Sequence, residues 1–304
     1  MEHVIALQNV TKKFGTFTAV DDMQLLVNRA EVFGFLGPNG AGKSTTLRMM
    51  LSLIQPSSGH IELFGKDLRQ HRSDILRRIG CIIEKPDFYR YLSGLDNLRI
   101  FGALSQTRDL RRRIDYALEL TGLKGREKDK VAAYSHGMKQ RLGLAQALLH
   151  DPELVILDEP TTGLDPQGII ELRQLILQLR QEGKTVLLSS HILSEIELIA
   201  DSMAIIYKGK AVVQGKVSEL LSAQENLNVR VEVADAEHAA AVVRSTRLAE
   251  ILRGTAPGVL DFHCRREDIP ELLAALCGHG LPVYGVRATR GLEDYFLRIT
   301  EQSQ

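Results

Sequence analysis

One short stretch constrains the fold of this chain more than any other. Residues 37–45 read GPNGAGKST and fit the phosphate-binding loop pattern G-x-x-x-x-G-K-[ST] at every fixed position. The apolar run 32–36 before the loop predicts a buried strand, and residues 45–55 after it predict a helix. A loop between a strand and a helix N-terminus turns backbone N–H groups toward one anion, and the helix dipole strengthens the attraction. The sequence therefore predicts a site for a nucleoside triphosphate.

Each part of this loop has an expected contact with the nucleotide. The glycines let the backbone wrap closely around phosphate oxygens. Lys43 is placed to reach the outer phosphates, and the Ser44 hydroxyl is placed to bind Mg²⁺. The predicted nucleotide-binding residues of the loop are Gly37, Pro38, Asn39, Gly40, Ala41, Gly42, Lys43, Ser44 and Thr45.

A second motif supplies two acidic residues. The apolar run 154–157 predicts a buried strand, and Asp158 and Glu159 follow it directly. Acidic residues past the carboxyl end of a parallel strand lie where open α/β sheets bind ligands. Asp158 is expected to hold Mg²⁺ through water, and Glu159 to act as general base toward the attacking water. A phosphate loop alone does not separate ATPases, kinases and GTPases. The Asp-Glu pair favours hydrolysis, and the base-reading motif N-K-x-D of a GTPase is missing from the sequence.

Composition sets the limits on partners and compartment. The 304 residues suffice for about two domains. Basic and acidic residues number 38 each, so charge gives no argument for a nucleic-acid partner, and none is expected. The three scattered cysteines fit a reducing compartment. The start of the chain lacks the form of a signal peptide, and no apolar run approaches the roughly 20 residues of a membrane span. Any membrane role is therefore expected to come through a partner.

Hydrophobic patterning predicts an α/β chain in two domains. Residues 1–222 form the nucleotide-binding domain, with a helical subdomain at about 86–150, and residues 227–304 form a small C-terminal α/β domain without a catalytic constellation. The expected N-terminal strands are 4–7, 17–20 and 23–27. The expected helices of the C-terminal domain are 237–252, 268–277 and 292–299.

Two side-chain groups have competing interpretations. Phe14 lies between two predicted strands, where an aromatic ring can stack on a nucleotide base or simply cover a strand end. Residues 111–113 are three consecutive arginines, for which a solvated helix face is favoured over a binding site because the net charge is zero.

The order of the motifs along the chain resembles the nucleotide-binding subunit of an ABC transporter, from about residue 4 to about residue 217. The motifs that carry this resemblance are the phosphate loop, the signature-like stretch 134–138 (YSHGM), the strand 154–159, the segment 162–165 (TGLD) and Ser190-His191. The resemblance implies a P-loop NTPase cassette with a RecA-like parallel core, an antiparallel β subdomain and a helical subdomain. It also implies a head-to-tail dimer that holds two ATP molecules between its subunits, each with Mg²⁺.

The resemblance also assigns roles to single residues. It implies that Phe14 stacks on adenine, that Ser44 and Asp158 serve Mg²⁺, that Glu159 activates water and that His191 contacts the γ-phosphate. Ser135 and Gly137 would reach the ATP of the other subunit, and Asp165 lies in the segment that links the two sites. Glu84 stands where the loop between the lobes usually carries Gln, beside the Mg²⁺-bound water.

Two departures from the usual pattern stand out. Tyr134, His136 and Met138 replace the first, third and fifth residues of the usual signature L-S-G-G-Q, and the His136 side chain must point away from the phosphates or crowd them. Glu84 adds negative charge beside a triphosphate, which is expected to weaken the resting affinity for ATP.

Both departures resemble the bacitracin-exporter-like branch, in which the ATPase is a separate polypeptide. This implies an ABC-2-type transmembrane permease as partner, a homodimer or a paired cassette, and a position on the inner face of the cell membrane. The function expected is the ATP-hydrolysing subunit of an exporter. The alternative is a soluble ABC-type ATPase that acts on a protein or nucleic-acid complex. A third interpretation, compatible with the exporter, makes the C-terminal domain a regulatory or dimerising module controlled by ATP.

Overall fold

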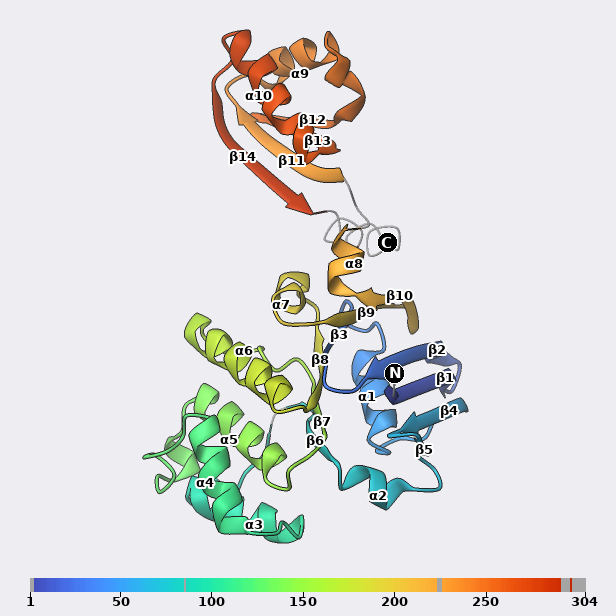
Figure 1. Cartoon of the computed structure of the whole chain (residues 1–304), viewed down its shortest axis with the longest axis vertical. Coiled ribbons are helices and arrows are strands. Elements are labelled where there is room, and N and C mark those ends of the chain that lie inside the picture. Colours follow the sequence, from blue (N-terminus) through green and yellow to red (C-terminus); the bar gives the residue numbers. More distant parts are fainter. Residues whose placement is uncertain (1–2, 85, 223–225, 291–295, 297–304) are drawn as a thin grey trace. The chain divides into compact units, whose positions relative to one another are not determined.

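The structure is a computed structural model that describes residues 3–84, 86–222, 226–290 and 296 (Figure 1). The chain divides into two compact units, Met1–Val217 and Ser218–Gln304. The sequence had placed the boundary slightly later, at residues 223–226. Within the described residues, no helix is both long and apolar enough to cross a membrane.

A six-stranded sheet forms the centre of the first unit. Its strand order is β10-β9-β3-β8-β7-β6. All neighbouring strands run parallel except the β9–β10 hairpin. Every residue of β3, β7 and β8 is buried, as expected for parallel strands covered on both faces. The strands are β3 (Val32–Leu36), β6 (Ile79–Ile82), β7 (Leu154–Leu157), β8 (Thr185–Ser190), β9 (Ser202–Tyr207) and β10 (Lys210–Lys216).

An antiparallel sheet with the order β2-β1-β4-β5 makes up the second layer. Its strands are β1 (His3–Phe14), β2 (Phe17–Asn28), β4 (Ser58–Leu63) and β5 (Lys66–Asp67). The prediction of three short N-terminal strands was wrong, because β1 and β2 each continue through an irregular position. Asn9 and Asp22 both have positive φ, and the Asn9 side chain donates to Asp22 at 2.8 Å, so the bulged ladder holds together.

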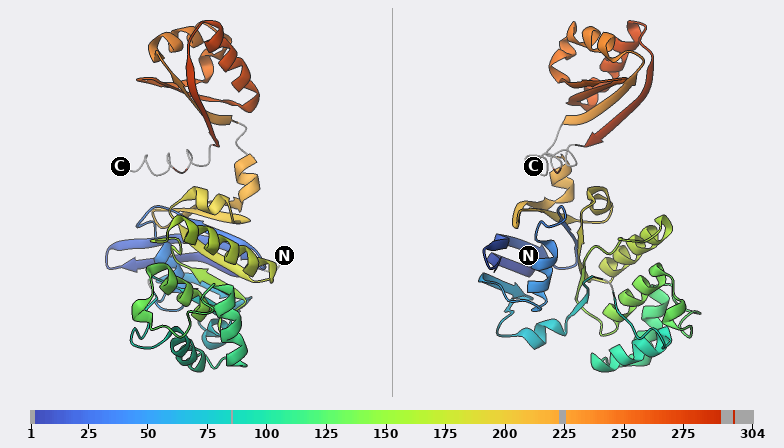
Figure 2. Two further views of the ribbon diagram at one scale, coloured as in Figure 1. Left: turned by 90° about the vertical axis from the view of Figure 1, so that its left-hand side faces the viewer. Right: turned by 180° about the vertical axis from the view of Figure 1, so that it is seen from behind.

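Helix α1 (Lys43–Met50) packs between these two sheets (Figures 1 and 2). Its buried Leu47, Met49 and Met50 share one core with Phe33 and Phe35 of β3 and with the apolar residues of β1 and β2. The helix ends five residues earlier than predicted, since Ser52 already adopts a left-handed backbone. This core fixes the loop that precedes α1 against the end of β3.

Three helices form a separate lobe of the first unit, as predicted: α3 (Gly94–Leu104), α4 (Leu110–Leu120) and α5 (His136–Leu148). They enclose their own core, which includes Leu98, Ile114, Leu118 and Leu142. The remaining helices of the unit are α2 (Arg72–Leu76), α6 (Pro166–Gln181) and α7 (Leu193–Glu197), with a 3₁₀ turn at Val131–Ala133. Helix α8 (Val217–Ser222) follows at the boundary.

Two helices of the first unit begin at side-chain caps. Ser135 Oγ accepts from Met138 N at 3.2 Å at the start of α5. Asp165 Oδ1 accepts from Gly168 N at 2.8 Å at the start of α6, with Pro166 as its first residue. These caps set the entry points of the two helices that border the cavity described below.

Over residues 226–290, the second unit has a four-stranded antiparallel sheet with the order β12-β13-β11-β14, and helices α9 and α10 share its core. Its chain order is the β-α-β-β-α-β arrangement of ferredoxin-like folds. The elements are β11 (Asn226–Val233), α9 (Ala236–Arg244), β12 (Leu252–Ala256), β13 (Val259–Arg265), α10 (Ile269–Gly278) and β14 (Val283–Arg290), with 3₁₀ turns at Arg247–Ile251 and Arg266–Asp268.

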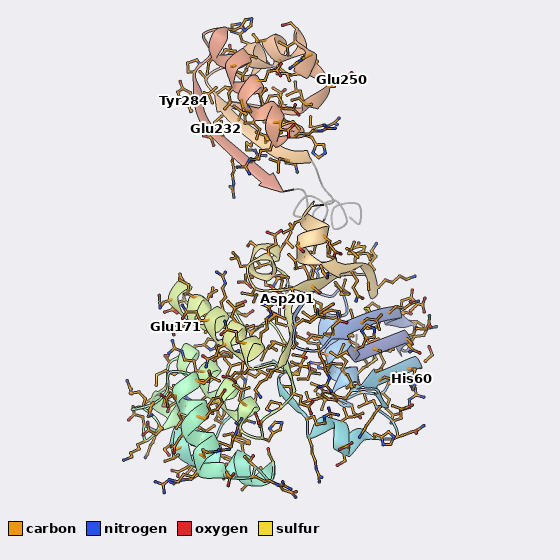
Figure 3. All side chains as sticks on the ribbon, in the orientation of Figure 1. His60, Glu171, Asp201, Glu232, Glu250 and Tyr284 are labelled. Carbon is orange, nitrogen blue, oxygen red and sulfur yellow. The ribbon has the colours of Figure 1, made fainter. Side chains whose placement is uncertain are left out.

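The helix expected over 237–252 is too long. Ser245 and Thr246 bond back to the carbonyls of Val242 and Val243, which ends α9 at Arg244. The strand β12 was not predicted. Exposed positions of this unit carry residues such as Glu232, Glu250 and Tyr284 (Figure 3). The predicted helix 292–299 lies outside the described residues except for Phe296.

Candidate nucleotide site at the carboxyl end of the central sheet

The phosphate loop joins the end of β3 to the start of α1, as its sequence predicts. Gly40 and Gly42 have φ values of 80° and 103°, which only glycine adopts without strain. A side chain on Gly42 would stand 2.6 Å from the carbonyl oxygen of Ala19, and one on Gly37 would stand 2.4 Å from that of Ile206. The tight backbone of this loop therefore depends on glycine at these positions.

Residues of the loop differ in how far solvent reaches them. Gly37, Ala41, Gly42 and Lys43 are buried, whereas Pro38, Ser44 and Thr45 are half-buried and Asn39 and Gly40 are exposed. Lys43 is 6% exposed, and its Nζ donates to the carbonyls of Gly37 at 2.5 Å and of Pro38 at 3.2 Å. The ammonium group is therefore enclosed by the loop that it would serve.

Lys43, Glu159 and His191 meet at the carboxyl ends of β3, β7 and β8. Lys43 Nζ lies 3.2 Å from Glu159 Oε1, and His191 Nδ1 lies 2.7 Å from Glu159 Oε2. Residues that are far apart in the sequence are thus brought together by the parallel sheet. The carboxylate of Glu159 lies between the Lys43 ammonium group and the His191 ring. A carboxylate held in this way can accept a proton, and it can give up its contact with Lys43 when an anion binds the ammonium group.

Glu159 also has an unusual backbone. Its φ is 48°, a left-handed value that side chains other than glycine seldom adopt, and such strain gathers at functional sites. Its N–H donates to Ser189 Oγ at 2.8 Å, and Ser189 Oγ donates in turn to Asp158 Oδ1 at 2.6 Å. One hydroxyl of β8 therefore orients both acidic residues that follow β7.

Two predicted ligand residues have contacts of their own. Glu84 forms an ion pair with Arg48 of α1, so the charge that its substitution for Gln adds is neutralised within the chain. Phe14 ends β1, is 50% exposed and has Lys12 Nζ 5.0 Å from its ring centroid. Phe14 belongs to the β1–β2 hairpin, and Ala19 of this hairpin lies against Gly42 of the phosphate loop. Stacking of Phe14 on adenine stays a prediction.

The signature-like stretch lies against segment 162–165 of the same chain. The His136 ring lies over this segment, with Nε2 3.4 Å from the Thr162 carbonyl oxygen. Gly163 accommodates it, since a side chain there would stand 2.9 Å from His136 Nε2. Tyr134 is buried and donates to the Arg126 carbonyl at 2.8 Å, and its burial raises the pKa of its hydroxyl. The altered signature residues therefore have structural contacts of their own.

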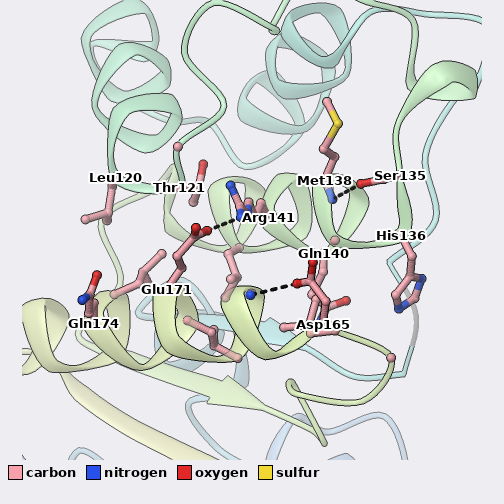
Figure 4. A pocket seen from close by; sticks show the side chains of 18 of the residues that line it. Leu120, Thr121, Ser135, His136, Met138, Gln140, Arg141, Asp165, Glu171 and Gln174 are labelled. Atoms are coloured by element: carbon pink, nitrogen blue, oxygen red, sulfur yellow. Dashed lines mark hydrogen bonds and ion pairs between the residues drawn. The ribbon is translucent and has the colours of Figure 1, made fainter.

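A cavity of about 550 Å³ opens between α5 and α6. Figure 4 shows Ser135 and Arg141 on one side of it, and Asp165 and Glu171 on the other. Gly137 also lines it, and Arg141 is ion-paired with Glu171 across it. The predicted contacts of Ser135, Gly137 and Asp165 with nucleotide thus share one surface, apart from the cluster at Lys43.

Sequence reasoning missed two side chains of this region. Ser189 was not singled out, although it precedes Ser190-His191 directly. Glu195 was not singled out at all, and yet it is only 7% exposed and bonds to residues on both sides of the cluster. A carboxylate four positions after His191 is the only signal that the sequence offered for it.

The fold and this cluster define a P-loop nucleotide hydrolase, and comparisons with known proteins identify its kind. The family model for ABC transporters matches residues 20–162. An uncharacterised ABC transporter ATP-binding protein, YhcH of Bacillus subtilis, is 40% identical over 100% of this chain and 98% of its own length. The bacitracin transport ATP-binding protein BcrA of Bacillus licheniformis is 49% identical over 69% of each chain.

Solved structures agree with this result. The structure of an ATP-binding subunit of an ABC transporter superposes with a TM-score of 0.66 and 29% identity, over 72% of this chain and 92% of the other. The chain belongs to the ABC transporter family, as an ATP-binding subunit. It binds nucleotide and is an ATP hydrolase.

Proposed function

We propose that this chain powers an exporter by coupling ATP-driven closure of a cassette dimer to transport by a separate ABC-2-type permease. The observation that carries the proposal is the meeting of Lys43, Glu159 and His191 at the phosphate loop. Glu159 and His191 are the catalytic residues of this proposal, and the loop residues 37–45 hold the phosphates.

The chemistry follows from the pairing of Lys43 with Glu159. The γ-phosphate of ATP competes for the Lys43 ammonium and so releases Glu159 Oε1. Glu159 then accepts a proton from the water that attacks the γ-phosphorus, and ADP and inorganic phosphate leave. His191, bonded through Nδ1 to the same carboxylate, orients it and contacts the γ-phosphate through its other nitrogen.

Mg²⁺ fits the residues at this site. This ion keeps several waters and binds through one or two protein oxygens together with substrate phosphates. Ser44 in the first turn of α1 and Asp158 after β7 supply such oxygens, and Asp158 is held by Ser189. When bound, Mg²⁺ neutralises charge on the β- and γ-phosphates. Glu84 would contact its water only after the ion pair with Arg48 opens.

A second cassette completes each site in this proposal. Ser135, Gly137 and Asp165 line the cavity between α5 and α6 and serve the nucleotide of the partner cassette. Exposed Ile170 of α6 and Ile192, next to His191, supply apolar area for the contact. The dimer consists of two copies or of this chain with a related cassette.

The helical lobe offers a surface for the permease. Phe88, Tyr89 and Phe101 form a cluster with ring centroids 6.1 and 6.3 Å apart. Tyr89 and Tyr91 are 44% and 70% exposed, and exposed apolar groups that lie together mark interaction sites. Phe88 and Tyr89 of this cluster follow Glu84 closely in the sequence. A movement of Glu84 on ATP binding or hydrolysis would therefore be passed to a permease segment bound at the cluster. The subunit then acts at the inner face of the membrane.

The direction of transport and the cargo belong to the permease. We assign export because the chain resembles the bacitracin-exporter-like branch and its relative BcrA bears the name of a bacitracin transport protein.

The test is to identify what the cassette binds when it is closed. A tagged Glu159→Gln form is purified with MgATP from solubilised membranes, beside a Glu159→Gln/Tyr91→Ala form as matched control. We expect a polytopic membrane protein in fixed ratio, with less of it in the control. A soluble partner instead would favour an ABC-type ATPase that acts on a protein or nucleic-acid complex.

A further inference from the structure

Glu195 is a buried acidic residue beside the catalytic cluster. It lies on the short helix α7 and is 7% exposed. Its Oε2 accepts from Thr161 Oγ1 at 2.9 Å and from Ser190 Oγ at 3.1 Å. A single carboxylate oxygen therefore joins two segments of the chain that are distant in sequence.

These two segments carry the catalytic residues. Thr161 follows Glu159 by two positions, and Ser190 directly precedes His191. The backbone around Ser190 is fixed further, since Ile192 N donates to Ser190 Oγ at 3.0 Å. Glu195 therefore links the segment that carries Glu159 to the segment that carries His191, the two residues that are in contact at 2.7 Å.

Ser189 makes a second bridge from the neighbouring position of β8. It bonds to Asp158 and to the backbone of Glu159, and adjacent strand residues point to opposite faces. The acidic segment after β7 is thus held from both faces of the sheet, by Ser189 on one face and by Ser190 with Glu195 on the other.

The bonding of Glu195 is costly for stability. Among the residues that the structure describes, no cation is ion-paired with it, and both of its donors are neutral hydroxyls. Burying a carboxylate without a counter-ion is unfavourable, and an apolar side chain of similar size would fill the space at lower cost. Such a group is better explained by the reaction that it supports than by packing.

We propose that Glu195 is a positioning residue that holds Glu159 and His191 in register for ATP hydrolysis by binding Thr161 and Ser190. The proposal rests on the catalytic roles assigned to Glu159 and His191 above. It places Glu195 behind the reacting groups, without contact with ATP, so its loss affects turnover and leaves binding at the phosphate loop intact.

The chain contains a matched control, Glu31. This residue is 9% exposed and is also bonded to a serine hydroxyl, with Ser202 Oγ donating at 3.0 Å and Asn28 N donating at 2.7 Å. It precedes β3 at the opposite end of the sheet from the cluster. Glu31→Leu therefore removes a similar buried carboxylate without touching the site.

The test compares steady-state ATP hydrolysis of the full chain with Glu195→Leu, Glu195→Gln, Thr161→Val and Glu31→Leu. We expect Glu195→Leu to lower kcat at least about tenfold with KM for ATP within about twofold, because a displacement of catalytic groups by about 1 Å can cost up to about a hundredfold in rate. Glu195→Gln keeps an acceptor oxygen and restores most of the rate. Glu31→Leu lowers only the melting temperature.

A double-mutant cycle provides the second readout. If Glu195 acts through Thr161, the single Thr161→Val substitution lowers kcat. The same substitution then lowers kcat little further when it is added to Glu195→Leu. Should Glu195→Leu fail to fold, the single Thr161→Val variant decides: a lowered kcat with an unchanged KM for ATP supports the proposal, and an unchanged kcat overturns it.

Two results would overturn the proposal: an unchanged kcat, or independent effects of the two substitutions. Glu159→Gln run alongside separates the two claims. If Glu159→Gln hydrolyses ATP normally, the proposed catalytic roles fail. If it is inactive while the Glu195 and Thr161 variants match the wild type, only the role of Glu195 fails.

Discussion

The two ends of the six-stranded sheet carry charged side chains in contrasting arrangements. At the amino ends, charged residues directly precede β6, β7, β8 and β9, and each of these residues is paired with another charge. Arg78 binds Glu153 at 2.6 Å, Lys184 binds Asp151 at 2.7 Å, and Asp201, labelled in Figure 3, binds Arg180 at 2.6 Å. These pairs are complete within the chain.

At the carboxyl ends, a single carboxylate, that of Glu159, is shared between two nitrogen groups. Glu159 contacts both Lys43 and His191, has a left-handed backbone, and leaves Oε1 without a hydrogen bond among the described residues although Lys43 is near. A complete ion pair at the surface adds modest stability, whereas a shared and strained group can change partners when an anion binds. The same strands therefore stabilise the fold at one end and position chemistry at the other.

Exchanging lysine for alanine at each end gives the largest expected contrast. Lys43→Ala lowers ATP affinity at least about a hundredfold, because the phosphates of ATP lose the buried ammonium group that pairs with them. Lys184→Ala leaves ATP affinity unchanged and lowers the free energy of unfolding by about 1 kcal/mol. Equilibrium binding of labelled ATP and denaturant titration measure the two effects. Normal ATP binding by Lys43→Ala would remove the distinction between the two ends.

The amino end predicts a pH-dependent effect on stability. The hydrogen bond from Arg78 holds the pKa of Glu153 below its usual value, and the charges of Arg78 and Arg29 add to this. A lowered pKa contributes stability above the unfolded-state value, and this contribution disappears as pH falls through the folded-state value. Glu153→Gln therefore costs up to about 1 kcal/mol at pH 7, screened because the side chain is 44% exposed, and nothing in strong acid.

Denaturant titration of Glu153→Gln and wild type at several pH values checks this difference. A gap between the two proteins that stays constant into acid would contradict the assigned ion pair.

The smallest effect concerns Glu84 after β6. Because Arg48 neutralises it, Glu84→Gln changes ATP affinity by less than about threefold. Arg48→Gln leaves Glu84 uncompensated beside the phosphates and weakens binding more. Affinities of the two variants, measured at low and at physiological salt, test the order. Equal changes in ATP affinity for Glu84→Gln and Arg48→Gln would show that Arg48 does not neutralise the charge of Glu84 at the nucleotide site.

Local signals predicted which residues lie at the carboxyl end of the sheet, because each of them belongs to a short motif. The phosphate loop, the two acidic residues after β7 and the caps Ser135 and Asp165 each depend on neighbours within a few positions. The long β1 and β2 strands could not be predicted, since the contact between Asn9 and Asp22 joins separate strands. Glu195 was missed for the same reason, as Thr161 lies 34 positions away.

The most direct test of this account is ATP hydrolysis by Glu159→Gln beside Glu153→Gln. These two glutamates flank β7, one at each end of the same strand. In a phosphate-release assay at saturating MgATP, the account predicts a loss of about a thousandfold for Glu159→Gln with ATP binding retained, and a normal rate for Glu153→Gln. Turnover by Glu159→Gln within about twofold of wild type would contradict the assignment of chemistry to the carboxyl end.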